Sequence, residues 1–321
     1  MSGCNLNCWK YVIAPIDFTN LAFYKEQFEN LSNVQIPVVA KKEREIPKTL
    51  HFIWLGPKEF PRASIPNLLS WIEKHPGWTV KFWTGRKRPL PTNNIEQIIV
   101  EHSQSKELEK CYTKTNNYAE KTDLLRYEIL FKEVGVYIDH DVRCFKSLSD
   151  LTNQFELICG LELPVDTPVS SSIHATNSLI AARPFHPILA RCITRLPPIW
   201  DTIEMLYPGN DKSSVIHRVA NRTFAAFADS VRELSGNQTK DMVAPAYYFN
   251  APSDELAVYA RHLYAGTWFQ NDNPFEEMAR NRLMALSKKA NKILLFIGVT
   301  TGLNMLAIAS MFYFLQKKLK I

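Results

Sequence analysis

Apolar residues between Ala119 and Val134 recur at intervals of three and four, the period of a helix that packs one face on a core. Gly135 follows, a residue that tolerates the positive φ at which helices commonly end. The next three residues, Val136 to Ile138, form a β-branched and aromatic run typical of a buried strand. The pattern therefore predicts a helix, a turn and a strand that leads directly into Asp139-His140-Asp141.

Similar patterns on either side predict further helices and strands. Strands are expected at Thr49 to Leu55, Thr79 to Trp83, 156–161 and 179–182. Helices are expected at residues 20–31, 67–74, 94–102, 186–195, 199–207 and 214–234. This alternation predicts an α/β fold, with a mostly parallel sheet covered by helices on both faces.

Two carboxylates, Asp139 and Asp141, follow the predicted strand at its carboxyl end, where open α/β sheets bind ligands. Carboxylate oxygens suit Mg²⁺ or Mn²⁺, and such a cation would neutralise a departing diphosphate. A D-x-D sequence alone also fits a solvated turn. On the preceding helix, Asp123 and Arg126 are three residues apart and share a face. That pair fits either a ligand site or an ordinary ion pair within the helix.

Composition and charge narrow the class of protein. Of 321 residues, 46% are hydrophobic and 22% charged, which is typical of a globular protein. The net charge is +6, but eight basic residues follow Glu277, the last acidic residue, so the preceding chain is slightly acidic. This distribution argues against a nucleic-acid partner. The six cysteines show no C-x-x-C spacing, so neither a zinc site nor a dense disulfide framework is expected.

The segment Ile293 to Leu315 contains 23 residues without a charge, enough for a helix to cross a bilayer. Lysines flank it on both sides, so the charge distribution does not decide its orientation. The N-terminus has no long apolar run of the kind found in secretory signals. We therefore expect a single-pass C-terminal membrane anchor, with the folded part of the chain in the cytosol.

Four motifs occur in order along the chain: LHFIWLG (50–56), SWIEKHPGW (70–78), KFWT (81–84) and AEKTDLLRYEILFKEVGVYIDHDV (119–142). Together they resemble glycosyltransferase family 32, a D-x-D sugar-transferase family that includes the yeast initiating α-1,6-mannosyltransferase and the inositol-phosphoceramide mannosyltransferases. The blocks GLE (160–162), ATNSLIAARPFHP (175–187) and RHLYAGTW (261–268) follow in family order. The spacing of the site residues is also similar to that in the large clostridial glucosylating toxins: Asp123, Arg126, Tyr137, Asp139 and Asp141.

The resemblance implies a GT-A type domain over residues 46–280, after a lead-in over residues 1–45 and before the membrane helix at 293–315. It implies that His262 joins Asp139 and Asp141 at the metal, and that Asp123 and Arg126 hold the sugar and the diphosphate. It also implies donor contacts from four other residues: Trp54 on the base, Asn177 on the sugar, and Thr267 and Trp268 near the phosphates. The residues alone also allow structural roles: Trp54 could pack at a sheet edge and Asn177 could be a turn residue before a strand. His262 could be a solvent-exposed residue of a loop.

We therefore expect a metal-dependent, retaining transfer of a hexose from a UDP- or GDP-sugar to a glycolipid or protein hydroxyl at a membrane. The Gly-Pro usual in this family is absent, and Arg222-Thr223-Phe224-Ala225 stands in its place, so acceptor recognition is not carried over from the resemblance. The sequence also leaves the oligomeric state open. One alternative is a phosphohydrolase or phosphotransferase with Asp139 as nucleophile, although Arg143 stands where such enzymes usually carry Thr or Val. Another is a membrane-tethered protein that binds nucleotide sugars without turnover.

Overall fold

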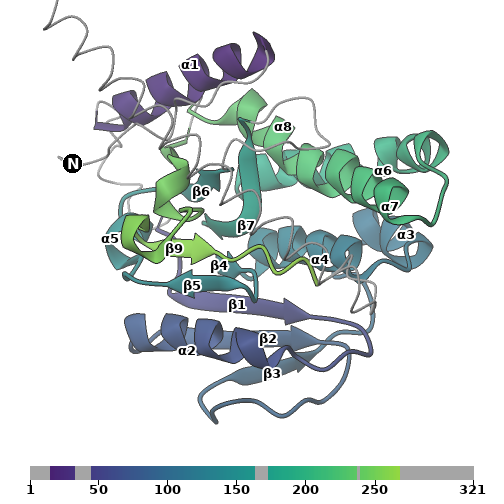
Figure 1. Cartoon of the computed structure of the whole chain (residues 1–321), viewed down its shortest axis with the longest axis horizontal. Helices are drawn as coiled ribbons and strands as arrows, with labels where there is room; N and C mark the ends of the chain where they lie inside the picture. Colours follow the sequence, from purple (N-terminus) through teal and green to yellow (C-terminus); the bar gives the residue numbers. More distant parts are fainter. Residues whose placement is uncertain (1–14, 33–44, 163–172, 237–238, 268–321) are drawn as a thin grey trace, which may run out of the picture. The chain divides into compact units, whose positions relative to one another are not determined.

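The computed structural model describes residues 15–32, 45–162, 173–236 and 239–267 (Figure 1). All of them belong to the compact unit Met1–Phe269, and the second unit, Gln270–Ile321, lies outside the described residues. The predicted membrane helix at 293–315 belongs to this second unit. Trp268 also lies outside the described residues, which end at Thr267. None of the described helices combines the length and the apolar character that crossing a membrane requires.

A seven-stranded sheet forms the centre of the described unit, in the order β3-β2-β1-β4-β7-β6-β8 (Figure 1). The strands are β1 (Thr49–Trp54), β2 (Thr79–Thr84), β3 (Glu96–Ile99), β4 (Gly135–Ile138), β6 (Leu157–Leu161), β7 (Ala175–Ala182) and β8 (Asp241–Ala244). Only β7 runs antiparallel to its neighbours among these strands. A two-stranded antiparallel sheet pairs β5 (Val142–Cys144) with β9 (Ala260–His262). The prediction of an α/β fold with a mostly parallel sheet is confirmed.

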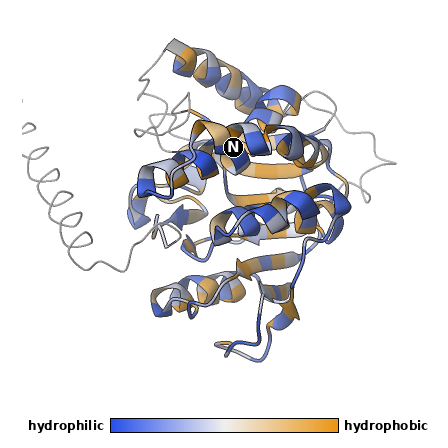
Figure 2. Ribbon diagram, turned by 90° about the vertical axis from the view of Figure 1, so that its right-hand side faces the viewer, coloured by the Kyte–Doolittle hydropathy of each residue, from blue (hydrophilic) through white to orange (hydrophobic). Residues whose placement is uncertain are grey.

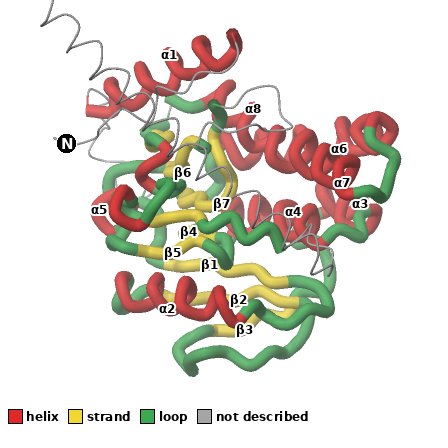
Figure 3. The backbone as a smooth tube through the Cα atoms, in the orientation of Figure 1, coloured by secondary structure: helices red, strands yellow, loops and turns green. Residues whose placement is uncertain are grey.

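Helices cover both faces of this sheet (Figures 1 and 3). They are α1 (Pro15–Glu29), α2 (Ile65–Lys74), α3 (Lys106–Lys114), α4 (Tyr118–Lys132), α5 (Ser149–Thr152), α6 (Pro187–Leu206), α7 (Lys212–Val219) and α8 (Ala225–Leu234). Short 3₁₀ turns occur at Asn30–Ser32, Arg62–Ser64, Ala246–Tyr248 and Asp254–Leu256, and a π-helical turn, η6, at Ala220–Phe224.

Two hydrophobic cores lie on opposite faces of the sheet. Alternate residues of β7 enter different cores: Ile180 packs with α4, α6 and α8, whereas Leu179 packs with α2 and α5. Side chains alternate between the faces of a strand, so the two cores are separated by the sheet. Figure 2 shows the central strands mainly hydrophobic, while the helices carry both hydrophobic and hydrophilic residues.

The predicted helix at 94–102 is wrong. Residues 96–99 form β3, which pairs in parallel with β2 at the edge of the sheet. The side chain of Gln97 also accepts from the backbone N–H of Arg88 and donates to its carbonyl, which fixes the strand. A helix does form nearby, α3, whose N-terminus is capped by the Ser105 hydroxyl. The helices predicted at 186–195 and 199–207 are one continuous helix, α6, which runs through Pro197 and Pro198.

Candidate active site

The D-x-D turn begins at the carboxyl end of β4. The N–H of Asp139 donates to the carbonyl of Ser178 (2.8 Å), so the pairing with β7 extends to this residue. The N–H of Val142 then donates to the carbonyl of Asp139 (3.1 Å), which closes a turn around Asp139 and Asp141. Because β4 lies between parallel β1 and antiparallel β7, this turn sits where the sheet changes direction, the position predicted for ligand binding.

Asp139, Asp141 and His262 form a candidate metal site. One ligand atom from each residue lies within 4.8 Å of the others. The pairing of β5 with β9 sets Val142 opposite His262, which explains how a histidine distant in sequence reaches the D-x-D turn. Two carboxylates and an imidazole are a suitable donor set for Mn²⁺ or Mg²⁺, so these residues fit the predicted cation.

Asp141 is the more buried of the two D-x-D carboxylates. Its Oδ1 lies 3.4 Å from His262 Nε2, and its Oδ2 accepts from the N–H of Ala265 (2.7 Å). Burial opposes ionisation of Asp141, but the nearby His262 outweighs it and holds the pKa of this carboxyl well below its usual range. Burial likewise opposes charge on His262, yet Asp141 raises the pKa of this imidazole to about 9. The pair is therefore ionic at neutral pH when no cation is bound.

Arg126 connects the helix pair to the D-x-D turn. Its Nη2 lies 2.8 Å from Asp123 Oδ1 and 3.1 Å from Asp139 Oδ1. Its Nη1 donates to the carbonyl of Asn177 (2.5 Å), and the guanidinium lies over the ring of Tyr137 at 4.2 Å. Arg126 Nε has no hydrogen-bond partner among the described residues, although it is buried. Arg126 thus connects Asp123 of α4 with Tyr137 of β4 and with Asp139 of the D-x-D turn.

Asp123 is completely buried beside Arg126. Burial raises the pKa of its carboxyl to about 6, although Arg126 and the Thr223 hydroxyl act in the opposite direction. The side-chain amide of Asn177 donates to Asp123 Oδ1 (3.3 Å) and to the Tyr127 hydroxyl (2.9 Å). The Asn177 side chain therefore orients Asp123 from β7, and is not simply a turn residue before a strand.

Trp54 and His140 form an aromatic contact at the D-x-D turn. Trp54, at the end of β1, donates its indole N–H to the carbonyl of Lys58 (2.9 Å) and meets His140 edge to face, with ring centroids 5.0 Å apart. The His140 ring nitrogens lie 2.8 Å from the Ser64 hydroxyl and 3.1 Å from the Thr267 hydroxyl. His140 therefore joins Trp54 and Thr267 to the D-x-D turn. Sequence reasoning gave His140 no role, because a single histidine inside D-x-D has no spacing signal of its own.

Comparison with known proteins agrees with the motifs. Residues 61–157 match the family described as glycosyltransferase sugar-binding region containing DXD motif. The chain is 29% identical over 128 residues to the "Subversion of eukaryotic traffic protein A" of Legionella pneumophila, covering 35% of this chain and 19% of that protein. It is 28% identical over 204 residues to an uncharacterized glycosyltransferase of Acanthamoeba polyphaga mimivirus, covering 61% and 69%.

A third relative is the inositol phosphoceramide mannosyltransferase 1 of Schizosaccharomyces pombe, 25% identical over 249 residues, covering 76% of this chain and 69% of that protein. The chain thus spans about a fifth of the Legionella protein and about two thirds of the other two. Among solved structures, the catalytic domain of alpha-toxin from Clostridium novyi is similar with a TM-score of 0.40 at 12% identity, over 68% of each chain. Residues 61–157 are therefore similar to the sugar-binding region of glycosyltransferases that contain the DXD motif.

Proposed function

We propose that this chain uses a GT-A type domain to transfer a hexose from a UDP- or GDP-sugar to an acceptor hydroxyl, with Mn²⁺ or Mg²⁺ bound at Asp139, Asp141 and His262. The observation that carries this proposal is the buried Arg126 guanidinium, which contacts both Asp123 and Asp139. The Arg126 side chain thereby links Asp123, a carboxylate suited to sugar hydroxyls, with Asp139, a carboxylate suited to the metal. That arrangement fits a substrate in which a hexose is joined to a diphosphate.

The leaving diphosphate would lie between the metal site and Arg126. The bound cation would neutralise the negative charge that develops there. Arg126 adds a second positive charge, already oriented by two carboxylates and the ring of Tyr137. Its Nε, which has no partner in the part of the chain that the structure describes, would offer a donor to a phosphate or glycosyl oxygen. Fixed charges of this kind stabilise a departing diphosphate without reorganising during the reaction.

Asp123 would accept hydrogen bonds from hydroxyls of the hexose, with the Asn177 amide hydrogen-bonded beside it. Trp54 would stack on the nucleotide base, while His140 keeps Thr267 near the phosphates. Trp268, which follows Thr267, completes the proposed donor contacts. Retention of the anomeric configuration is proposed from the family resemblance, and NMR of the early product tests it, since an inverted anomer contradicts retention.

The acceptor is proposed to be a membrane lipid or a membrane-associated protein, reached by a cytosolic catalytic domain anchored through residues 293–315. The uncharged sequence of this segment and the flanking lysines support an anchor. Two relatives from Schizosaccharomyces pombe are named inositol phosphoceramide mannosyltransferases, which supports a lipid acceptor. Full-length protein should resist alkaline extraction from membranes, and its recovery in the soluble fraction would contradict the anchor.

Turnover of a nucleotide-sugar panel by the full-length chain tests the proposed function. With Mn²⁺ present, at least one UDP- or GDP-hexose should raise the melting temperature and be hydrolysed slowly to hexose and nucleoside diphosphate. Binding without hydrolysis or transfer would favour the nucleotide-sugar-binding protein. Release of phosphate from a phosphomonoester, with a phosphoenzyme at Asp139, would favour the phosphohydrolase.

A further inference from the structure

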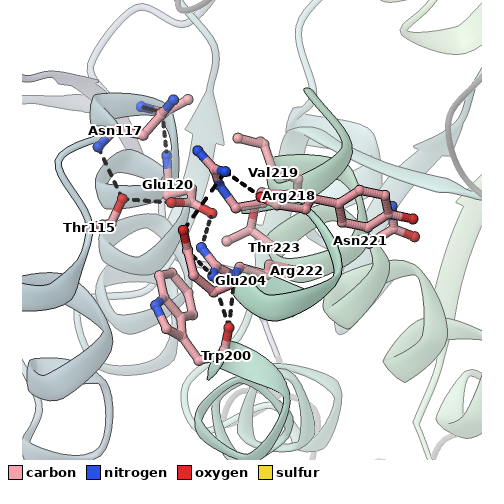
Figure 4. Close-up of polar contacts among 12 residues, drawn as sticks. Thr115, Asn117, Glu120, Trp200, Glu204, Arg218, Val219, Asn221, Arg222 and Thr223 are labelled. Carbon is pink, nitrogen blue, oxygen red and sulfur yellow. Dashed lines mark hydrogen bonds and ion pairs between the residues drawn. The ribbon is translucent and has the colours of Figure 1, made fainter. Parts of the chain in front are cut away.

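The π-helical turn η6 lies against the helix that carries Asp123 (Figure 4). On α4, Glu120, Asp123 and Tyr127 are spaced by three and four residues, so they lie on one face of the helix. Two consecutive residues of η6, Arg222 and Thr223, contact all three of them. π-Helical turns are rare in proteins, and those that occur often lie at functional sites.

Arg222 attaches the turn to its surroundings. Its side chain is 1% exposed, and its Nη1 donates to Glu120 Oε1 (2.9 Å). Its Nε and Nη2 both donate to the carbonyl of Trp200 on α6 (3.1 and 2.8 Å), and its guanidinium lies over the Trp200 ring at 4.4 Å. The other oxygen of Glu120 accepts from the Thr115 hydroxyl (2.6 Å). Arg222 thereby fixes η6 to both α4 and α6, as Figure 4 shows.

Thr223 uses this fixed position to contact Asp123. Its hydroxyl donates to Asp123 Oδ2 in a short hydrogen bond, and its carbonyl accepts from the Tyr127 hydroxyl (2.8 Å). Asp123 Oδ1 is held separately, by Arg126 at 2.8 Å and by Asn177. Each oxygen of the carboxylate therefore has its own partner, and the plane of the carboxylate is fixed.

We propose that Thr223 is a positioning residue for the glycosyl-transfer site: it sets the orientation in which Asp123 receives the donor hexose, while Arg222 holds Thr223 in place. A carboxylate held through one oxygen can rotate about its Cβ–Cγ bond, whereas one held through both cannot. Catalytic groups need such fixed orientations, because small misplacements reduce the rate strongly. This inference rests on the proposed function, in which Asp123 contacts the sugar.

The test compares substitutions at Thr223 in the full-length protein. Thr223→Val keeps the shape of the side chain but removes the hydroxyl, and should lower kcat/KM for nucleotide-sugar hydrolysis by about 10- to 100-fold. Its affinity for the free nucleoside diphosphate with Mn²⁺ should stay within about twofold of the wild-type value, because this ligand has no sugar to contact Asp123. Thr223→Ser, which keeps the hydroxyl, should recover most of the activity.

Asn221→Ala is the matched control within the same turn. The Asn221 amide donates to the His217 carbonyl (2.8 Å), and its side chain points away from Glu120 in Figure 4. This variant should keep wild-type turnover. If Thr223→Val does not fold, Arg222→Lys provides the test, because lysine keeps the charge beside Glu120 but cannot reproduce the fork of donors. It should lower kcat/KM about tenfold with nucleotide affinity unchanged.

The outcomes separate the two proposals. An inactive wild type would remove both the proposed function and this inference. An active wild type with Thr223→Val at equal kcat/KM would remove only the inference. A parallel loss of nucleotide affinity and turnover that Thr223→Ser fails to recover would show that Thr223 is merely structural, and would also overturn it.

Discussion

Replacing Asp123 by asparagine tests whether the buried carboxylate lowers the stability of the folded protein while serving the reaction. Complete burial raises the pKa of Asp123 to about 6, compared with an ordinary value of 3.8. A difference of this size corresponds to roughly 3 kcal/mol of folding free energy. Because the pKa is raised in the folded protein, the protonated form is the one that folding favours. Stability from this group is complete below about pH 4 and is lost as the pH rises through about 6.

Asparagine fits the hydrogen bonds around position 123. Its oxygen can accept from Arg126 and Asn177, as Oδ1 does now, and its amide can donate to the Thr223 hydroxyl. The Thr223 hydrogen can then turn to the carbonyl of Val219, which lies 3.1 Å away. Arg126 keeps its ion pair with Asp139 at 3.1 Å. No buried polar atom of this group therefore loses its partner.

At pH 7.5 we expect the free energy of unfolding of Asp123→Asn to equal that of the wild type or to exceed it, by up to about 3 kcal/mol. Nucleotide-sugar turnover should fall by about 100-fold or more. Urea unfolding at pH 4.5 and 7.5, followed by tryptophan fluorescence, measures the difference between the two proteins at each pH. Asp150→Asn removes an exposed carboxylate and controls for the lost charge. An Asp123→Asn protein that is clearly less stable than the wild type at pH 7.5, or equally active, would contradict the role given to this carboxylate.

Three further predictions concern other parts of the described unit. Glu120→Gln and Arg222→Met should each lower the free energy of unfolding by about 3–5 kcal/mol, because each leaves a buried charge without its partner. The double variant should lose less than the sum of the two, and additive losses in urea unfolding would contradict a coupled buried pair. Gly135→Ala should lower the free energy of unfolding by about 2 kcal/mol or more, because φ is +117° and the new Cβ would lie 2.5 Å from the Thr49 carbonyl oxygen. A melting temperature equal to that of the wild type would contradict this. Trp54→Ala should weaken nucleotide binding by about tenfold or more in calorimetry, and Trp54→Phe by less; unchanged affinity for both would exclude base stacking.

Local sequence patterns predicted the parts of the fold whose signals are local. The helix now seen as α4 and the strand β4 have clear periodicities, and a turn with two consecutive residues of positive φ, Val134 and Gly135, joins them. The edge strand β3 was missed because only four residues form it, and its pairing with β2 is a contact distant in sequence. The strands β8 and β9 were not predicted for the same reason.

The site was predictable only where one element carries several of its residues. Asp123 and Arg126 share a helix face, and Asp139 and Asp141 share a turn, so spacing alone suggested them. The contact of His262 with Asp141 depends on the pairing of β5 with β9, and the resemblance to a known family, not the spacing, pointed to it. Neither spacing nor resemblance gave Thr223 a role, because its contact with Asp123 forms only when α7, η6 and α8 fold over α4.

In the proposed function, Asp139 and Asp141 hold a divalent cation against the diphosphate of a nucleotide sugar. Hydrolysis of the preferred donor by the full-length chain, measured with Mn²⁺, with EDTA and after Mn²⁺ is restored, tests this most directly. We predict turnover with Mn²⁺, a loss of about 100-fold or more in EDTA, and recovery when the metal returns. Asp141→Asn should stay near the EDTA level even with Mn²⁺ present. Near-normal hydrolysis in EDTA, or by Asp141→Asn, would contradict both the metal site and metal-dependent transfer.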